Sequence, residues 1–224
     1  MSAHRPDIAH VLFDLDGTLL DTAPDLAAAL NALLARHGRP ALPYARIRPQ
    51  VSHGGAALVR LGFGIDPRAA GFEPLRQALL DLYHANVARE TRLFDGMEAL
   101  LGRIERAGMR WGIVTNKPGW LTAPLLRALG LDQRPACVVS GDTLPERKPH
   151  PAPLRHAAAL MAGTPSRCLY IGDAARDIAA GRAAGMATLA ALYGYIPDDE
   201  DPERWGATAA VATPAEIGTW LALD

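Results

Sequence analysis

The hydrophobic positions of this chain follow two patterns, and the change between them divides the sequence. In residues 1–19 and 92–224, short apolar runs alternate with amphipathic helical segments. Such alternation predicts a parallel sheet with helices on both faces. In residues 20–91 apolar residues recur at helical spacing, and no convincing strand is found. We therefore expect an α/β core that is discontinuous in sequence, with a helical domain inserted after its first strand.

The same pattern predicts where the elements lie. Strands are predicted over residues 11–13, 110–115, 136–140, 168–172 and 186–192, and a short apolar piece follows near residue 209. Core helices are predicted over residues 97–107, 121–129, 153–161 and 178–184, with a last helix after Pro214. Helices of the inserted domain are predicted between residues 21 and 38 and over 44–51, 56–61 and 72–89. Residues 19–22 and 92–96 would link this domain to the core.

Composition excludes some classes of function. Hydrophobic residues make up 49% of the 224 residues and charged residues 21%, which is typical of a globular protein. The net charge of -1 gives no basic field for nucleic acid, and no apolar run approaches the ~20 residues of a membrane helix. Because Met1–Asp7 lacks a signal-peptide layout, we expect a cytoplasmic protein that binds neither nucleic acid nor membrane. These features do not predict the oligomeric state.

The first predicted strand ends in two acids. Residues 11–13 are apolar and favour a buried strand, and they are followed by Asp14, Asp16 and Gly17. Asp and Gly are poor strand residues, so the chain should turn here and bring both carboxylates into one crevice. Two carboxylates that lie close together repel each other and need a cation or a shared proton.

Polar residues also follow the other predicted strands. In an open parallel sheet, ligands bind at the carboxyl ends of the strands. Those ends carry Thr115 with Asn116, and Asp173 with Asp177 one helical turn later, while Lys148 follows in a proline-bounded loop. Carboxylate oxygens suit Mg²⁺, and a lysine with a hydroxyl suits a phosphate. The sequence therefore predicts a site for a metal ion and a phosphate.

Four short motifs carry a family resemblance. The sequences F-D-L-D-G-T-L at 13–19, V-T-N at 114–116, K-P at 148–149 and G-D-A-A-R-D at 172–177 resemble the motifs of the haloacid dehalogenase superfamily. The helical insertion at 20–91 resembles the C1 cap of that superfamily. Within it the chain resembles phosphoglycolate phosphatases most, and among these it is most similar to N-acetylmuramic acid 6-phosphate phosphatases.

The resemblance implies a fold and a mechanism. The fold is a Rossmann-like three-layer core with strand order 3-2-1-4-5, and the helical cap lies over its carboxyl edge. Asp14 is implied as the nucleophile that forms an aspartyl-phosphate, and Asp16 as the general acid and base. Mg²⁺ is implied on the Asp14 carboxylate, the Asp16 backbone carbonyl and Asp173. The reaction is hydrolysis of a small phosphomonoester, and the partner is a phosphorylated metabolite.

Further residues receive supporting roles by the same resemblance. Thr115 and the Asn116 backbone would hold the phosphate oxygens, and Lys148 would neutralise their charge. Asp177 would orient Lys148 or waters on the metal. Ala174 stands where the superfamily often has Asp or Ser, and its methyl group removes a possible contact to the metal. We therefore expect weaker metal binding with the same chemistry.

Four other functions are compatible with parts of this motif set. A dehalogenase is disfavoured, because Asp16 would have no leaving alcohol to protonate. A phosphonatase is disfavoured, because residues 20–91 contain no lysine for a Schiff base. A sugar phosphomutase uses the same two acids and stays open. A non-catalytic protein that binds phosphate or a partner is disfavoured by the complete set of acids.

The helical domain should select the substrate. Its arginines could meet a carboxylate, as 2-phosphoglycolate or the lactyl group of N-acetylmuramic acid 6-phosphate would require; those nearest the motifs are Arg46, Arg48 and Arg60. His53 could line the site, although a surface histidine is the commoner case, and Gly54 and Gly55 would let a loop approach the crevice. Tyr195 and Trp205 could cover the site, but packing in the tail is the commoner role of such aromatics.

The two cysteines should stay apart. Cys137 and Cys168 lie in short apolar stretches, which is typical of buried cysteines. In the expected strand order they are three strand spacings apart, roughly 14 Å at ~4.8 Å each. A disulfide needs Cα atoms within ~7 Å, so we expect none.

Overall fold

The computed structural model describes residues 7–223, so most of the N-terminal segment considered above lies outside it. Its main sheet has six parallel strands in the order β5-β4-β1-β6-β7-β8. Their bounds are His10–Phe13 for β1, Arg110–Val114 for β4, Val138–Val139 for β5, Cys168–Gly172 for β6, Ala187–Ala191 for β7 and Ala209–Val211 for β8. The predicted order is confirmed. β8 adds a sixth strand at the edge, where the alanine-rich sequence predicted only a short apolar piece.

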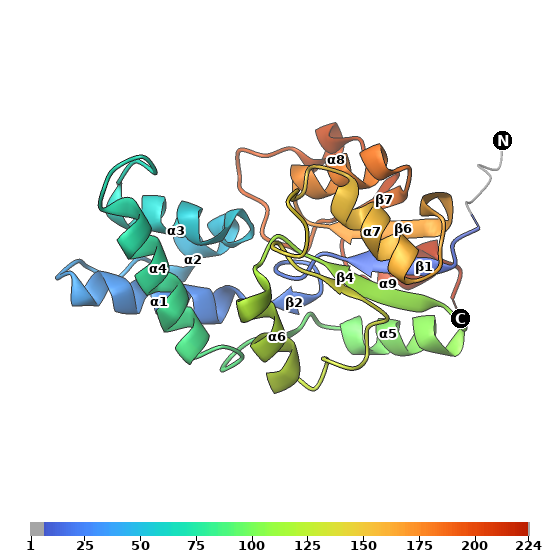
Figure 1. The fold of residues 1–224 in the computed structure, drawn as a ribbon, viewed down its shortest axis with the longest axis horizontal. Coiled ribbons are helices and arrows are strands. Elements are labelled where there is room, and N and C mark those ends of the chain that lie inside the picture. Colours follow the sequence, from blue (N-terminus) through green and yellow to red (C-terminus); the bar gives the residue numbers. More distant parts are fainter. Residues whose placement is uncertain (1–6, 224) are drawn as a thin grey trace.

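Helices cover both faces of this sheet (Figure 1). One face packs against α5, α6 and α9, which span Met97–Arg106, Gly119–Ala128 and Pro214–Trp220. The other face packs against α7 and α8, which span Ala152–Leu160 and Ala175–Ala184. Short 3-10 helices lie at Pro165–Arg167 and Pro202–Trp205. The core therefore has the three layers expected of the α/β class.

The central strand β1 shows why the sheet is buried. Val11 and Phe13 point into one apolar cluster and Leu12 into the other, and all three side chains are fully buried. Alternate residues of a strand face opposite sides, so an uninterrupted apolar run fits only a strand covered on both faces. The strand position places Asp14 at the middle of the carboxyl edge.

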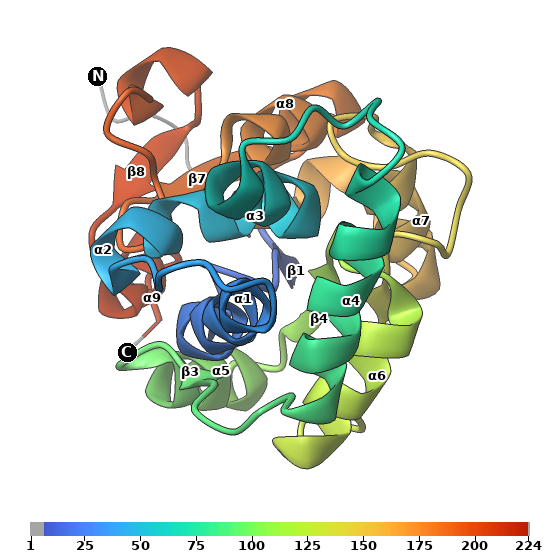
Figure 2. The ribbon, with the colours of Figure 1, turned by 90° about the vertical axis from the view of Figure 1, so that its left-hand side faces the viewer.

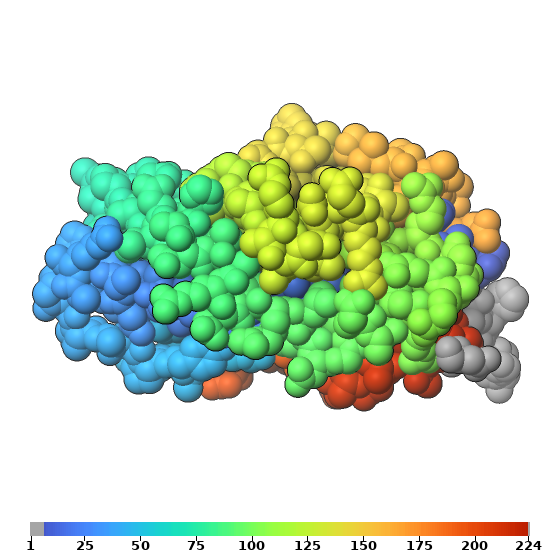
Figure 3. Space-filling model, turned by 90° about the horizontal axis from the view of Figure 1, so that it is seen from below, coloured from blue at the N-terminus to red at the C-terminus, as the bar shows by residue number. Residues whose placement is uncertain are grey.

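The helices of residues 23–85 pack together beyond that edge, and we call them the cap (Figures 1 and 2). They are α1 (Ala23–Arg36), α2 (Tyr44–Ile47), the 3-10 helix η1 (Arg48–His53), α3 (Gly54–Phe63) and α4 (Phe72–Ala85). The cap helices pack around a second apolar cluster, which includes Leu30, Leu58 and Leu79 and which Leu121 and Tyr195 of the core join. Figure 3 shows the cap, at the blue end of the colour scale, resting directly against the core.

Three details of the cap differ from the sequence pattern. The predicted helix over 44–51 is wrong beyond Ile47, because the chain tightens into η1 where Pro49 has no N–H to donate. The predicted helix over 72–89 is too long and ends at Ala85. The two linkers pair as an antiparallel ribbon of β2 (Leu20–Asp21) and β3 (Arg92–Leu93), which the pattern did not predict.

Two further findings concern the cysteines and the membrane. Cys137 and Cys168 are both free and buried, and Cys168 begins β6 while Cys137 precedes β5. Across residues 7–223, no helix combines the length and the apolar character that crossing a membrane requires.

Candidate active site

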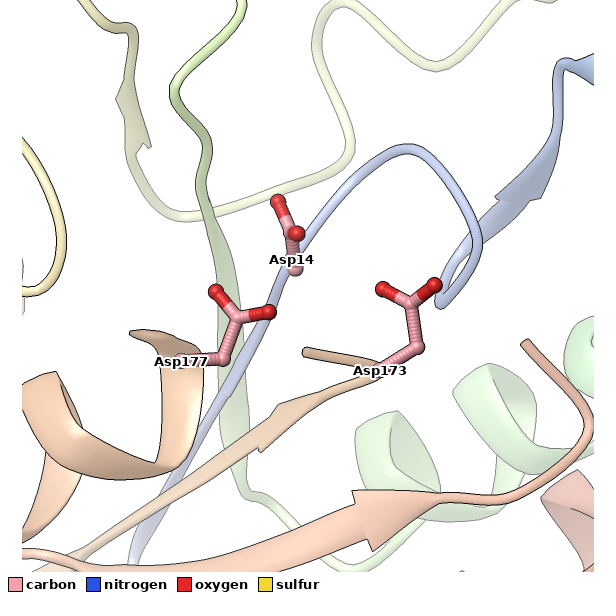
Figure 4. Close-up of side chains that lie close together, drawn as sticks. All are labelled: Asp14, Asp173 and Asp177. Carbon is pink, nitrogen blue, oxygen red and sulfur yellow. The ribbon is translucent and has the colours of Figure 1, made fainter. Parts of the chain in front are cut away.

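Three buried carboxylates meet at the carboxyl edge of the sheet (Figure 4). Asp14 follows β1, Asp173 follows β6, and Asp177 lies in the first turn of α8. One oxygen of each lies within 4.8 Å of the others, and their exposures are 3%, 1% and 0%. The strand ends thus bring together acids that are far apart in sequence, up to 163 residues for Asp14 and Asp177. Asp14, Asp173 and Asp177 are all among the residues named from the sequence as candidates for this site.

Lys148 is the cation within this cluster. Its Nζ lies 2.9 Å from Asp14 Oδ1 and 2.7 Å from Asp177 Oδ1, and it donates a hydrogen bond to the hydroxyl of Tyr170 at 2.7 Å. The side chain of Asn116 holds the Lys148 backbone, donating to its carbonyl at 3.0 Å and accepting from its N–H at 3.1 Å. Lys148 is therefore fixed by residues at the ends of three other strands, β1, β4 and β6.

The cluster carries more negative charge than its surroundings neutralise. Burial raises the pKa of Asp14 to about 7, although Lys148 opposes this, and Asp177 and Asp173 raise it further. Burial and the charge of Asp177 raise the pKa of Asp173 to about 6, against the hydrogen bonds from Ser52 and the Tyr195 backbone. Buried carboxylates with raised pKa values mark a place where a cation would relieve repulsion. Oxygen ligands in this number fit a hard divalent ion such as Mg²⁺.

Local hydrogen bonds orient each carboxylate. The Leu15 N–H donates to Asp14 Oδ1 at 2.7 Å, and the Ala174 N–H donates to Asp177 Oδ2 at 3.1 Å, which caps α8. Asp173 accepts from Thr18 Oγ1 at 3.2 Å and from the cap residue Ser52, whose Oγ donates to Oδ2 at 2.6 Å. A residue of the cap thus touches a carboxylate of the core.

Asp16 has separate surroundings. Its Oδ1 accepts a hydrogen bond from Thr22 Oγ1 at 2.6 Å and forms an ion pair with Lys117 Nζ at 2.7 Å. Thr115, at the end of β4, accepts from the Lys117 N–H through its Oγ1 at 3.1 Å. Sequence reasoning missed Lys117, although it directly follows the V-T-N motif. Its contact with Asp16 joins residues 101 positions apart and was not readable from spacing.

A cavity of about 600 Å³ lies between the cap and these residues. Its core side is formed by Asp14, Asp16, Thr115, Asn116 and Lys117, and its cap side includes Leu80 and Tyr83. Asp173, Asp177 and Lys148 lie outside the lining, behind Asp14. The cavity therefore opens onto the carboxylate of Asp14, with both apolar and charged groups around it.

The cap arginines lie elsewhere than expected. Arg48 donates to the carbonyls of Tyr193 and Gly194 at 3.0 Å each, and its guanidinium lies 4.9 Å from the centre of the Tyr195 ring. Arg46 and Arg60 are also absent from the cavity lining, and Arg60 lines a separate groove on the cap. The three arginines named in advance are therefore not at the cavity, which is lined instead by Arg76 of the cap and by Arg147 and Arg176 of the core.

The other candidates divide between the cavity and the packing. His53, Gly54 and Gly55 line the cavity, and His53 pairs with Glu200 at 3.5 Å while burial lowers its pKa. Tyr195 is fully buried, donates its hydroxyl to Asp21 at 2.6 Å and donates its N–H to Asp173 at 2.9 Å. Trp205 is half-buried in a 3-10 helix away from the cavity.

Comparison with known proteins identifies one family. The family model for haloacid dehalogenase-like hydrolases matches residues 8–185. A phosphoglycolate phosphatase from Xanthomonas campestris is 48% identical over 92% of this chain and 93% of its own length. An N-acetylmuramic acid 6-phosphate phosphatase from Pseudomonas aeruginosa is 45% identical over 95% of this chain and 94% of its own. The crystal structure of a predicted phosphoglycolate phosphatase from Haemophilus somnus matches with a TM-score of 0.83 at 27% identity, covering 95% of this chain and 97% of that one.

Proposed function

Because this chain belongs to the haloacid dehalogenase-like hydrolases and is a phosphatase of that family, we propose that it hydrolyses a small carboxylate-bearing phosphomonoester through an aspartyl-phosphate on Asp14. The observation that supports this most directly is the buried carboxylate of Asp14 at the floor of the cavity. Its Oδ1 is engaged by Leu15 and Lys148, which leaves Oδ2 to attack phosphorus. The phosphorylated metabolite would enter with its phosphate toward this edge of the sheet.

Each residue of the site has a separate role in the reaction. Asp14 Oδ2 forms the new bond to phosphorus, and the bond to the ester oxygen breaks, with its electron pair staying on that oxygen. Asp16 gives its proton to the departing alcohol and later takes one from the water that hydrolyses the aspartyl-phosphate. Thr115, the Asn116 backbone and Lys148 hold and neutralise the phosphoryl oxygens. Asp177 keeps Lys148 in place through their 2.7 Å contact.

A Mg²⁺ ion completes this proposal. Asp14, Asp173 and the Asp16 backbone carbonyl would hold it, with Asp177 behind them as a partner for Lys148 and for waters. When bound, the ion neutralises charge between the anionic nucleophile and the anionic phosphate. The raised pKa values of Asp14 and Asp173 support a cation site, because burial leaves their negative charges under-compensated.

The size of the cavity favours the larger of the two candidate substrates. At ~30 Å³ for each water molecule, 600 Å³ corresponds to about 20 waters. The two-carbon ester 2-phosphoglycolate would leave most of that volume to solvent, whereas N-acetylmuramic acid 6-phosphate would fill much more of it. Arg76 and Arg147 line the cavity and could receive the lactyl carboxylate. We therefore place the sugar phosphate first and 2-phosphoglycolate second.

The test is a steady-state comparison of kcat/KM with Mg²⁺ on a substrate panel. It contains both candidate esters, hexose 6-phosphates that lack a carboxylate, and β-glucose 1-phosphate. We expect N-acetylmuramic acid 6-phosphate to be the best substrate. Equal turnover of hexose phosphates without a carboxylate would contradict carboxylate recognition. Conversion of β-glucose 1-phosphate to the 6-phosphate would show a mutase, and no phosphate release from any ester would reject the proposal.

A further inference from the structure

The side chain of Lys117 is buried between the core and the cap. Only 6% of it is exposed, and its Nζ lies 2.7 Å from Asp16 Oδ1 and 4.5 Å from the centre of the Tyr83 ring. Tyr83 belongs to α4 of the cap and is itself fully buried. Burial opposes the charge on Lys117, but the effects of Asp16 and of Tyr83 together outweigh burial and raise the pKa of Lys117 above its ordinary value. Lys117 is therefore a fixed positive charge in contact with one acid.

We propose that Lys117 is a positioning residue, which together with the Tyr83 ring holds Asp16 in the orientation that protonates the leaving group. This inference rests on the proposed function, because it assumes that Asp16 is the general acid. It goes beyond that function by assigning roles to Lys117 and to Tyr83 of the cap. The chain has two lysines, and the other one, Lys148, contacts Asp14 instead.

The geometry at Asp16 supports this role. Lys117 and Thr22 both bind Oδ1, at 2.7 Å and 2.6 Å, so the two contacts fix the plane of the carboxyl group through one oxygen. Oδ2 is then left to carry the proton toward the cavity, which Asp16 lines beside Asp14. When one oxygen of a carboxyl group is held, the direction of the other oxygen is set as well. A general acid depends on this, because its proton must point toward the leaving oxygen.

The cap contacts Lys117 through the ring of Tyr83. An ammonium over an aromatic face is attracted by the ring, and the attraction grows when both groups are desolvated. The Tyr83 hydroxyl is buried and makes no hydrogen bond of ordinary geometry within residues 7–223, but Tyr83 lies close enough to raise the pKa of Lys117, and the centre of its ring is 4.5 Å from Nζ. Without the cap, Lys117 would face solvent on that side and could leave Asp16.

The reaction step gives a specific signature. As Asp14 attacks, the bond between phosphorus and the ester oxygen breaks, and the proton of Asp16 moves to that oxygen. An alkyl alcohol needs this proton in order to leave, whereas para-nitrophenolate is stable as an anion and does not. Asp16 also acts as the base in the later hydrolysis of the aspartyl-phosphate, a step that all esters share, so only kcat/KM, which reports the steps up to release of the alcohol, isolates its role as an acid. In kcat/KM, a residue that acts by orienting Asp16 must matter for alkyl esters and hardly at all for para-nitrophenyl phosphate.

The experiment compares Lys117→Met with the wild type on both kinds of ester. For N-acetylmuramic acid 6-phosphate or 2-phosphoglycolate, whichever the wild type hydrolyses better, we expect kcat/KM to fall about 10²-fold, the usual effect of a misplaced catalytic group. For para-nitrophenyl phosphate we expect a far smaller loss of kcat/KM. Lys117→Arg, which keeps the charge, should recover part of the alkyl-ester activity.

Matched variants separate this role from others. Lys148→Met removes the other buried lysine and should slow both esters together, because it acts at Asp14 and the phosphate. Tyr83→Leu should reproduce the ester-selective loss, while Tyr83→Phe, which keeps the ring, should not. Because both variants retain Lys117, they test the inference even if Lys117→Met fails to fold. Equal losses on the two esters in Lys117→Met or Tyr83→Leu, or a rise in KM alone, would overturn the inference. Failure of the wild type to hydrolyse either ester would instead reject the proposed function.

Discussion

Asp14→Asn should stabilise the metal-free protein while abolishing its activity. In the wild type, burial raises the pKa of Asp14 to about 7, and the charges of Asp177 and Asp173 add to this effect. Asparagine keeps the shape and can still accept the hydrogen bond that Leu15 donates to Oδ1. It removes one negative charge from a cluster in which Lys148 remains paired with Asp177 at 2.7 Å. The substitution therefore removes a repulsion that the folded state bears without metal.

The magnitude follows from linkage. A carboxyl group whose pKa is raised on folding stabilises the protein at low pH and loses that stability as the pH rises through the folded value. For Asp14 this window runs from the ordinary value of 3.8 to about 7. The shift of about three pH units corresponds to about 4 kcal/mol once the group is ionised in both states. Between about pH 4.5 and pH 8, the free energy of unfolding of Asp14→Asn should gain about 3 kcal/mol on the wild type.

The assay is urea unfolding of both proteins in EDTA across that pH range. The pH-independent difference between asparagine and protonated aspartate cancels when the two ends of the range are compared. Asp132→Asn, which changes an exposed carboxyl group in the loop before β5, is the control, and its difference from the wild type should not grow. A constant or shrinking gap for Asp14→Asn would refute the reasoning, because it would mean that Lys148 fully compensates the Asp14 charge.

Three further outcomes are expected. EDTA should abolish phosphatase activity and Mg²⁺ restore it, and Mg²⁺ at about a hundred times its Kd should add about 2.7 kcal/mol to stability, measured by thermal unfolding. Asp16→Asn should lower kcat on alkyl phosphates by about 10²–10⁴, measured with Mg²⁺ present. Gly194→Ala should weaken Mg²⁺ binding in a thermal-shift titration, because a Cβ there would collide with the Asp173 side chain and lie 2.6 Å from the Gly17 carbonyl oxygen. Unchanged Mg²⁺ affinity in Gly194→Ala would contradict the proposed role of Asp173.

The carboxyl edge of the sheet was predictable because its rules are local. An apolar run that ends in Asp14 sets both a strand and the place where the chain turns. Parallel strands then align their ends, so Thr115 and Asp173 needed no knowledge of side-chain packing to be placed beside Asp14. The same logic fails at β8, where small alanines carry no strand preference.

The contacts between cap and core were not predictable, because they depend on how two units dock. Residues of a helix point in all directions, and only docking decides which face meets the cavity. Arg76 of α4 lines it, whereas Arg60 of α3 faces a separate groove. Arg48 is held by the loop after β7, where it donates to the carbonyls of Tyr193 and Gly194, and this contact too depends on docking.

The loop after β7 contacts both the cap and the carboxylate of Asp173. Its Tyr195 N–H donates to Asp173, and its Gly194 backbone packs so closely on Asp173 that no larger residue fits. The same loop offers the carbonyls of Tyr193 and Gly194 to Arg48 of the cap. A movement of the cap away from the core would break both Arg48 hydrogen bonds and the one that Ser52 donates to Asp173. The carboxylate proposed to bind the metal is thus held in part by the cap, so the cap position that closes the cavity also fixes the geometry of Asp173.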